Sequence, residues 1–173
     1  METIIRIAVE KDLPGVLDIY NDAIINTTAV YDYKPHTLDM RKKWLDEKLK
    51  NNIPVLVAET DEQISGFASY GPFRAWAAYK YSVEHSVYVH KHFRRQGIAK
   101  KLLQSLIEEV RQKQIHTLIA GIDASNNISI QLHRQFGFEN AGCIKQAGYK
   151  FGKWLDLLFM QLILENDVQP TED

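Results

Sequence analysis

Four cationic residues surround a glycine where a predicted strand gives way to a predicted helix. Arg94, Arg95, Lys100 and Lys101 flank Gly97, and the opening turn of the helix contains no acidic residue. A helix N-terminus carries free N–H groups and a positive partial charge, so acidic side chains are normally favoured there. Gly97 would let the backbone approach an anion closely. The residues therefore predict a phosphate-binding loop, with a solvated basic face as the alternative.

A strand and a helix must hold this loop in place, and the sequence predicts both. Residues 82–90 are rich in residues that favour strands, and the helix that follows runs to about Gln112. Apolar residues recur along this helix at helical spacing and form one stripe, which should face a core. The stripe consists of Ile98, Leu102, Leu103, Leu106, Ile107 and Val110.

The other segments predict more strands and helices around this unit. The helix after Thr37 is expected to bury Met40, Trp44, Leu45 and Leu49 on its apolar face. Helices and strands alternate early and a hairpin closes the chain, which favours an α+β fold with a mixed sheet. The remaining predicted elements are strands over 3–8, 55–59, 64–70, 117–122, 143–149 and 154–164, and helices over 12–24 and 126–135.

Composition narrows the class of protein. The chain has 173 residues, of which 25% are charged, and we expect one domain over 1–164 followed by a polar tail over 165–173. A formal net charge of -1 disfavours general nucleic-acid binding, and no apolar run is long enough to cross a bilayer. The lone cysteine, Cys143, excludes an internal disulfide and suits a reducing compartment. We expect a cytoplasmic protein without nucleic-acid or membrane partners.

Several familiar reaction motifs are missing from the sequence. The chain contains neither G-x-x-x-x-G-K-[ST] nor G-x-G-x-x-G, so the basic loop differs from the two common glycine-rich nucleotide loops. The six histidines are scattered, and C-x-x-C and H-E-x-x-H are absent, so no metal is expected. The absence of G-x-S-x-G also disfavours a serine hydrolase.

The basic loop resembles a known signature. Arg94-x-x-Gly97-x-Ala99, directly after Val87-Tyr88-Val89, resembles the R/Q-x-x-G-x-G/A motif of the GNAT acyl-CoA-dependent N-acetyltransferases. The resemblance implies the GNAT fold, a mixed and mostly antiparallel sheet flanked by helices, and acetyl-CoA as co-substrate. In that family the loop amides hold the coenzyme A pyrophosphate. The resemblance implies cofactor contacts from Val87, Tyr88, Val89, Arg94, Arg95, Gln96, Gly97, Ile98, Ala99 and Lys100.

A second segment resembles the same family further along the chain. Asn126-x-x-Ser129, followed by Leu132-His133 and Gly137-Phe138, is similar to the family's later N-x-x-A/S…L-Y…G-F motif. The resemblance implies that Asn126 and Ser129 contact the pantetheine arm. His133 stands where many members have a tyrosine that protonates the departing thiolate. A helix cap at Asn126 and a buried core histidine at His133 are the alternatives.

Longer stretches resemble one subgroup, the phosphinothricin/methionine sulfoximine N-acetyltransferases. The likeness runs from Ile5 to about Leu164 and includes residues 71–74, 83–89 and 148–156, although the subgroup often has valine at Leu155. It implies acetylation of the α-amine of glutamate-like amino acids such as L-phosphinothricin, methionine sulfoximine and methionine sulfone. It further implies a homodimer, with the 149–154 hairpin at the interface, and resistance to such compounds.

The substrate pocket is predicted around two charged residues. An arginine fork matches a carboxylate, so Arg74 is the expected clamp, with Phe73, Ala75 and Trp76 beside it and a surface cation as the alternative. An ammonium must lose a proton before it attacks a thioester, and a carboxylate with a raised pKa suits that task. Glu84 is the predicted base, with a structural ion pair as its alternative.

The expected reaction is direct transfer without an acyl-enzyme. A backbone N–H of Val87–Val89 would stabilise the oxyanion, and His133 would protonate the thiolate. Two alternatives remain at this stage. One is acetylation of another amine, such as a polyamine, an aminoglycoside or a protein N-terminus, which Arg74 disfavours for polycations. The other is a non-catalytic acyl-CoA-binding module.

Overall fold

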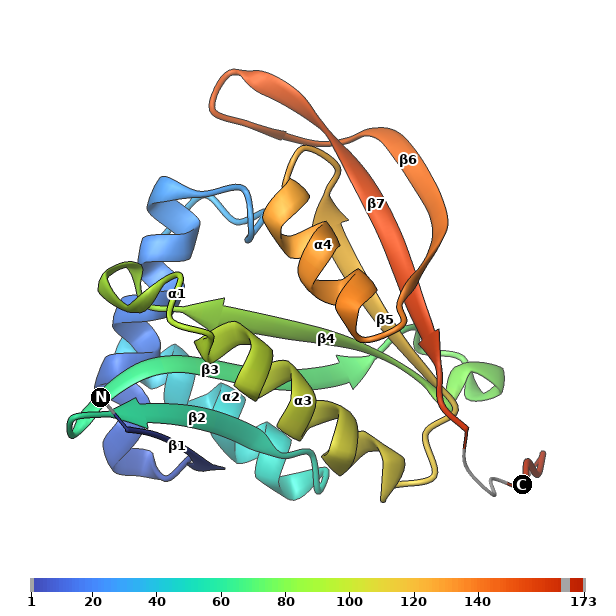
Figure 1. Cartoon of the computed structure of the whole chain (residues 1–173), viewed down its shortest axis with the longest axis horizontal. Helices are drawn as coiled ribbons and strands as arrows, with labels where there is room; N and C mark the ends of the chain where they lie inside the picture. The colour runs from blue at the N-terminus through green and yellow to red at the C-terminus, as the bar shows by residue number, and fades with distance from the viewer. Residues whose placement is uncertain (1, 166–168, 173) are drawn as a thin grey trace. The chain divides into compact units, whose positions relative to one another are not determined.

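The fold is described from a computed structural model, which describes residues 2–165 and 169–172. Strands and helices alternate along the chain and are labelled in Figure 1. The strands are β1 (Thr3–Ile7), β2 (Val55–Thr60), β3 (Gln63–Pro72), β4 (Ser82–Val89), β5 (Thr117–Asp123), β6 (Glu139–Lys150) and β7 (Lys153–Ile163). The α-helices are α1 (Leu13–Asn26), α2 (Leu38–Lys50), α3 (Ile98–Arg111) and α4 (Asn127–Gln135), with short 3-10 turns at Glu10–Asp12, Ala77–Tyr79 and Lys91–Phe93.

The strands form a mixed sheet in the order β1-β2-β3-β4-β5-β7-β6. The pair β4–β5 is parallel, whereas β1–β2, β2–β3, β5–β7 and β6–β7 are antiparallel. The predicted α+β class, with a mixed and mostly antiparallel sheet and helices around it, is confirmed.

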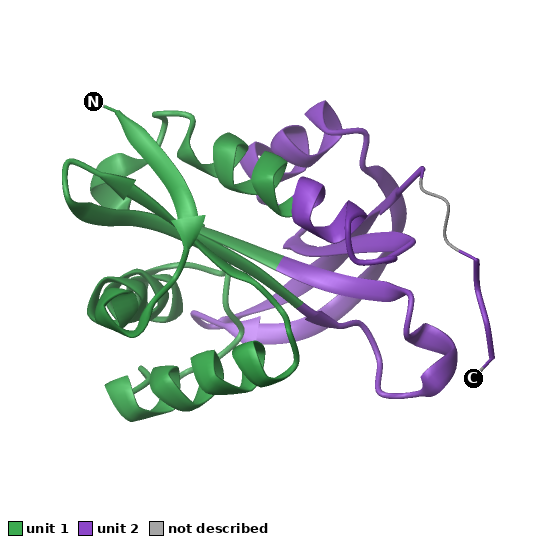
Figure 2. Cartoon of the chain, turned by 90° about the horizontal axis from the view of Figure 1, so that it is seen from below, with its two compact units in different colours: residues 1–70, 86–106 green, residues 71–85, 107–173 purple. Residues whose placement is uncertain are grey.

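The chain divides into two compact units, coloured separately in Figure 2. Unit 1 comprises residues 1–70 and 86–106, and unit 2 comprises residues 71–85 and 107–173. The chain passes from one unit to the other within β3, within β4 and again within α3. The single domain expected over 1–164 stays a prediction.

Unit 1 is built around the antiparallel strands β1, β2 and β3. Strand β2 is buried on both faces over residues 55–58, and its alternate residues Val55 and Val57 share one cluster with Phe67 of β3. The apolar faces of α1 and α2 add Val16, Ile19 and Leu45 to this cluster. Their removal from water is the main stabilising contribution to this unit. Tyr20, Trp44, Ile64 and Tyr88 pack around the same core.

Helix α2 departs from the predicted burial. Leu45 is buried and Trp44 packs against the core, but Met40 and Leu49 are exposed. Arg41 is buried instead, with 5% of its surface exposed, and its guanidinium lies 4.1 Å from the Tyr20 ring centroid and 4.6 Å from that of Trp44. A planar guanidinium is stabilised by such stacking, which apolar periodicity does not reveal. The predicted α3 stripe, by contrast, is buried at all six positions.

Unit 2 is built on β5, which pairs with β4 on one side and β7 on the other. Strand β6 starts at Glu139, four residues before the predicted start, because register shifts near Gly142 and Gly148 let it follow β7 farther. Most of β6 is exposed, and the long β6–β7 hairpin is drawn in orange and red in Figure 1. Exposed aromatic side chains, Tyr149, Phe151 and Trp154, gather at its turn.

The last strand ends just before the predicted polar tail begins. Strand β7 ends at Ile163, and Leu164 is buried. In the tail, the Thr171 backbone N–H donates to the Tyr81 hydroxyl at 2.8 Å, whereas 166–168 and 173 lie outside the described residues. Among the described residues, no helix combines the length and apolar character needed to span a membrane.

Candidate functional site

The basic loop of unit 1 has an unusual backbone. Arg95 (φ 63°) and Gly97 (φ 77°) both lie in the left-handed region just before α3 begins at Ile98. The left-handed conformation costs a non-glycine residue about 1–2 kcal/mol, so Arg95 holds strain of the kind that often marks functional sites. When residues of a loop alternate between the ordinary and the left-handed conformation, successive backbone N–H groups can point into one concavity. Such a concavity binds anions. A Cβ built on Gly97 would meet no atom within 4 Å, so the backbone there is open to a ligand.

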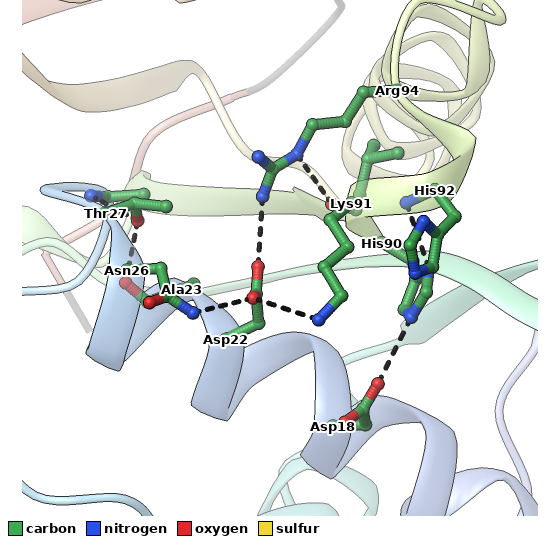
Figure 3. Close-up of polar contacts among 11 residues, drawn as sticks. Asp18, Asp22, Ala23, Asn26, Thr27, His90, Lys91, His92 and Arg94 are labelled. Atoms are coloured by element: carbon green, nitrogen blue, oxygen red, sulfur yellow. Dashed lines mark hydrogen bonds and ion pairs between the residues drawn. The ribbon is translucent and has the colours of Figure 1, made fainter.

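An acid from another element faces the cations of this loop. Arg94 donates from Nη2 to Asp22 Oδ2 on α1 at 3.2 Å, and Lys91 Nζ lies 3.8 Å from Asp22 Oδ1 (Figure 3). The Arg94 Nε also donates to the Val89 carbonyl at 3.5 Å. The local sequence showed cations without an acid, but the fold brings Asp22 to them. The Arg94 side chain thus ties the loop to α1.

A histidine next to the loop makes a parallel connection. His90 Nε2 lies 3.2 Å from Asp18 Oδ2 on α1, one helical turn before Asp22 (Figure 3). Residues four apart share one helix face, so Asp18 and Asp22 both face the loop. Exposed ion pairs contribute only ~0.2–1 kcal/mol each, so their main effect is to orient the loop.

The end of β4 that leads into the loop is packed through one aromatic side chain. The Tyr88 ring lies 5.0 Å from the Phe67 ring and 5.6 Å from the Tyr20 ring, measured between centroids. The side chain of Tyr88 therefore belongs to the core of unit 1. The predicted cofactor contact of Tyr88 would therefore have to come from its backbone, and those of Val87 and Val89 stay predictions.

Glu84, the predicted base, lies half-buried against the middle of β5 in unit 2. Its Oε1 atom would lie 2.7 Å from a Cβ built on Gly121, and Leu157 and Phe159 on β7 border the same spot. Burial raises the pKa of the Glu84 carboxyl, and the positive charge of Arg74 opposes that rise. A carboxylate in this environment is suited to accept a proton.

Some of the predicted substrate residues are packed together in unit 2, whereas others are exposed. Phe73 packs edge-on against Phe159 and Tyr79, with ring centroids 6.1 and 5.8 Å apart, and the Arg74 guanidinium lies 4.5 Å from the Phe73 centroid. Phe73, Arg74 and Glu84 are therefore gathered on one part of unit 2. Ala75 is exposed, and Trp76 is 71% exposed.

His133 on α4 is buried, with 5% of its surface exposed, and it pairs with a second histidine. Its Nδ1 lies 2.7 Å from the Ser129 carbonyl oxygen, which can only accept, so Nδ1 carries the proton. Its Nε2 lies 3.2 Å from His85 Nε2, so His85 must be the donor. Among the described residues, the buried Nδ1 of His85 has no hydrogen-bond partner. Burial lowers the pKa of both rings, that of His85 to about 3.

Asn126 caps helix α4, which was the alternative to its predicted cofactor contact. Its Oδ1 accepts from the Ser129 backbone N–H at 3.1 Å. Because Oδ1 is used by the cap, the predicted cofactor contact of Asn126 would have to come from its amide nitrogen. Among the described residues, no cluster of three or more histidine, cysteine or acidic side chains is arranged to hold a metal ion.

The fold and the loop together define the class of protein. The chain matches the acetyltransferase (GNAT) domain over residues 5–159 and belongs to that family. It is thus an N-acetyltransferase, as the resemblance predicted. An L-methionine sulfoximine/L-methionine sulfone acetyltransferase of Pseudomonas aeruginosa is 46% identical over 166 residues, covering 95% of this chain and 96% of the relative.

Two solved structures resemble the chain over nearly its whole length. A phosphinothricin acetyltransferase of Sinorhizobium meliloti in complex with acetyl-CoA is 34% identical, with a TM-score of 0.94, covering 99% of this chain and 95% of that one. A ribosomal-protein-alanine N-acetyltransferase of Brucella melitensis is 52% identical, with a TM-score of 0.92, covering 93% of this chain and 99% of that one. The expected GNAT fold is confirmed.

Four residues that define these surroundings were not predicted from the sequence. Asp22 lies far from the loop in sequence, and Gly121 and Phe159 lie on different strands from Glu84. His85 follows Glu84 in β4, and its pairing with His133 was not predicted. The signal that could have found Gly121 is a glycine within an otherwise apolar β run.

We expect Gly97→Ala to weaken acetyl-CoA binding. Alanine in the left-handed region costs about 1–2 kcal/mol, so if binding requires this loop conformation, the Kd for acetyl-CoA should rise roughly 5- to 30-fold. Gly152→Ala is the matched control, because Gly152 (φ 74°) also has nothing within 4 Å of a built Cβ. Calorimetric titration of both variants checks this. Equal affinities in the two variants would contradict a role for Gly97.

The histidine pair predicts a loss of stability in mild acid. Folding keeps both rings neutral, whereas an unfolded histidine gains a proton below about pH 6.5. Stability is thus fully present above that pH and falls as the pH drops below it, by up to ~1.4 kcal/mol per pH unit for each ring. Urea unfolding between pH 7.5 and 5.5 should show a shallower decline for His85→Phe. The exposed His116 provides the control, because His116→Gln should retain the original slope.

Proposed function

We propose that the protein transfers the acetyl group of acetyl-CoA to the α-amine of phosphinothricin-like amino acids, namely L-phosphinothricin, methionine sulfoximine and methionine sulfone. The observation that carries this proposal is the half-buried Glu84 carboxylate beside Arg74 in unit 2. The names of the Pseudomonas and Sinorhizobium relatives support the same substrate class.

Arg74 would bind the carboxylate of the amino acid through its guanidinium fork. Its position over the Phe73 ring restricts the side chain, so less freedom is lost when it binds. Phe73, Ala75 and Trp76 are proposed as the neighbouring contacts. A carboxylate clamp favours amino acids over polycations, which Arg74 would repel.

Glu84 is the proposed general base. The carboxylate takes a proton from the substrate ammonium, which leaves the nitrogen lone pair free to attack. Acetyl-CoA supplies the acetyl group as a thioester, whose C–S bond breaks as the N–C bond forms. A backbone N–H of Val87–Val89 would stabilise the negative charge that develops on the carbonyl oxygen.

The basic loop is the proposed anchor for coenzyme A. The N–H groups of Arg95 to Lys100, including Gln96, Ile98 and Ala99, would receive the pyrophosphate, and the open backbone at Gly97 supports this assignment. Arg94 would contact the cofactor while its guanidinium remains hydrogen-bonded to Asp22. Asn126 and Ser129 would contact the pantetheine arm.

His133 is the proposed donor of a proton to the coenzyme A thiolate. Its Nδ1 proton is held by the Ser129 carbonyl, so the proton would have to leave through Nε2, which accepts from His85. The role therefore requires the histidine pair to open or to pass a proton along it.

We further propose a cytoplasmic homodimer that confers resistance to such compounds. The exposed aromatic residues at the β6–β7 turn, Tyr149, Phe151 and Trp154, are suited to contact a second copy. The reducing cytoplasm suits the exposed free thiol of Cys143. No nucleic-acid or membrane partner is proposed.

Acetylation of a protein N-terminus is the second candidate function. The name of the Brucella neighbour, which is 52% identical, favours it. Both candidates require deprotonation of an α-amine, so Glu84 would serve either one. They differ in what surrounds the amine, because only a free amino acid presents a carboxylate on the same carbon.

A thiol-release assay with acetyl-CoA separates these functions. The panel contains L-phosphinothricin, L-methionine sulfoximine, L-methionine sulfone, spermidine, an aminoglycoside and a peptide with an N-terminal alanine. Selective turnover of the first three is expected, because only they offer Arg74 an α-carboxylate. Turnover of the peptide alone would transfer the proposal to protein substrates. Acetyl-CoA binding without any turnover would favour a binding module.

We expect Glu84→Gln to lower kcat/KM by about 10²- to 10⁴-fold, the usual contribution of a general base. In the parent enzyme, activity should fall as the pH drops through the raised pKa of Glu84, because the protonated carboxyl cannot accept the amine proton. The variant should lose this decline. Glu62→Gln, in the exposed β2–β3 turn, is the control. An unchanged pH profile in Glu84→Gln would remove Glu84 from the mechanism.

A further inference from the structure

Gly121 is a glycine in the interior of a strand that is hydrogen-bonded on both sides. It pairs with Phe159 on β7, and the residue before it, Ala120, pairs with His85 on β4. Glycine weakens a strand interior, so its presence there often marks a close approach by another group. Gly121 is absent from the residues with a positive φ, so the backbone conformation itself does not require glycine.

The group that approaches Gly121 is the carboxylate of Glu84. A Cβ at position 121 would lie 2.7 Å from Glu84 Oε1, closer than real Cβ contacts allow. The same Cβ would lie 3.5 Å from Leu157 and 3.7 Å from Phe159, which are ordinary contacts. Glu84 is therefore the one group among these neighbours that a side chain at position 121 would displace.

The surface of Gly121 is exposed although its neighbours in β5, Ala120 and Ile122, are buried. The carboxylate thus lies on an open patch of backbone, bordered by Leu157 and Phe159, rather than in a closed core. An amine that approaches this patch can reach Oε1 without displacing a side chain at position 121.

We propose that Gly121 is a positioning residue for the general base: its missing side chain leaves the space in which the Glu84 carboxylate lies against β5 and accepts the proton of the substrate α-amine. The proposal rests on the proposed function for the proton transfer. The placement of the carboxylate by Gly121 is independent of that function. Any residue with a Cβ at this position would push the carboxylate away from β5.

A double-mutant cycle tests the proposal, with Gly121→Ala, Glu84→Asp and the double variant. Displacing a catalytic group by about 1 Å can cost 10²-fold, so we expect Gly121→Ala to lower kcat/KM by roughly 10- to 100-fold in the parent enzyme. Aspartate is one methylene shorter, so the added methyl should cost less than about 3-fold in the Glu84→Asp background. The KM for acetyl-CoA and the Tm should change little. Equal losses in both backgrounds would overturn the proposal.

A measurement without turnover separates this proposal from the proposed function. Carbon NMR of the side-chain carboxyls, with the Glu84 signal assigned by its loss in Glu84→Gln, follows its titration directly. Gly121→Ala should move the midpoint of this titration, whereas Gly152→Ala should leave it in place. An unmoved midpoint would overturn the positioning role even if the enzyme is active. A moved midpoint in a protein that acetylates no amine would support the positioning of Glu84 and refute the proposed function.

Discussion

The hydrogen-bonded ladders on the two sides of β5 are the constraint on which the site in unit 2 depends. One side holds β4, and with it Glu84, in parallel register, while the other side holds Leu157 and Phe159 on β7. A shift of one residue in either ladder would turn these side chains to the opposite face. The backbone pairing thus determines that the Glu84 carboxylate, Leu157 and Phe159 meet at Gly121, and the Phe73 ring packs against that of Phe159. The raised pKa of Glu84 follows from this placement.

The two faces of β4 in unit 2 carry different chemistry. Glu84 lies on an open patch where a carboxylate can exchange a proton, whereas His85 lies on the buried face and donates to His133. Burial has opposite consequences for the two groups because it disfavours the charged form of each. It raises the pKa of the carboxyl and lowers that of the imidazole. One residue therefore gains a function suited to a base, while its neighbour is held neutral as part of the core.

Much of the fold follows from periodicity. The α3 stripe was predicted completely because six apolar residues at helical spacing leave one burial pattern, and the basic loop was predicted because its charges contradict the helix dipole. The burial of Arg41 was not predictable in this way. Its stabilisation comes from rings on α1 and α2 that stack on a cation, and a hydrophobicity pattern does not register that interaction. Strand β6 was predicted too short because its register shifts depend on β7.

The sequence by itself determined the family and predicted a phosphate-binding loop, a base and a clamp, since these depend on residue types at short spacing. Tertiary structure alone decided what surrounds them. Asp22 reaches Arg94 from a different helix, and His85 donates to a histidine 48 residues away. Gly121 accommodates the Glu84 carboxylate from the neighbouring strand. These contacts depend on strand register and helix packing, which arise from the whole folded chain, so no local pattern encodes them.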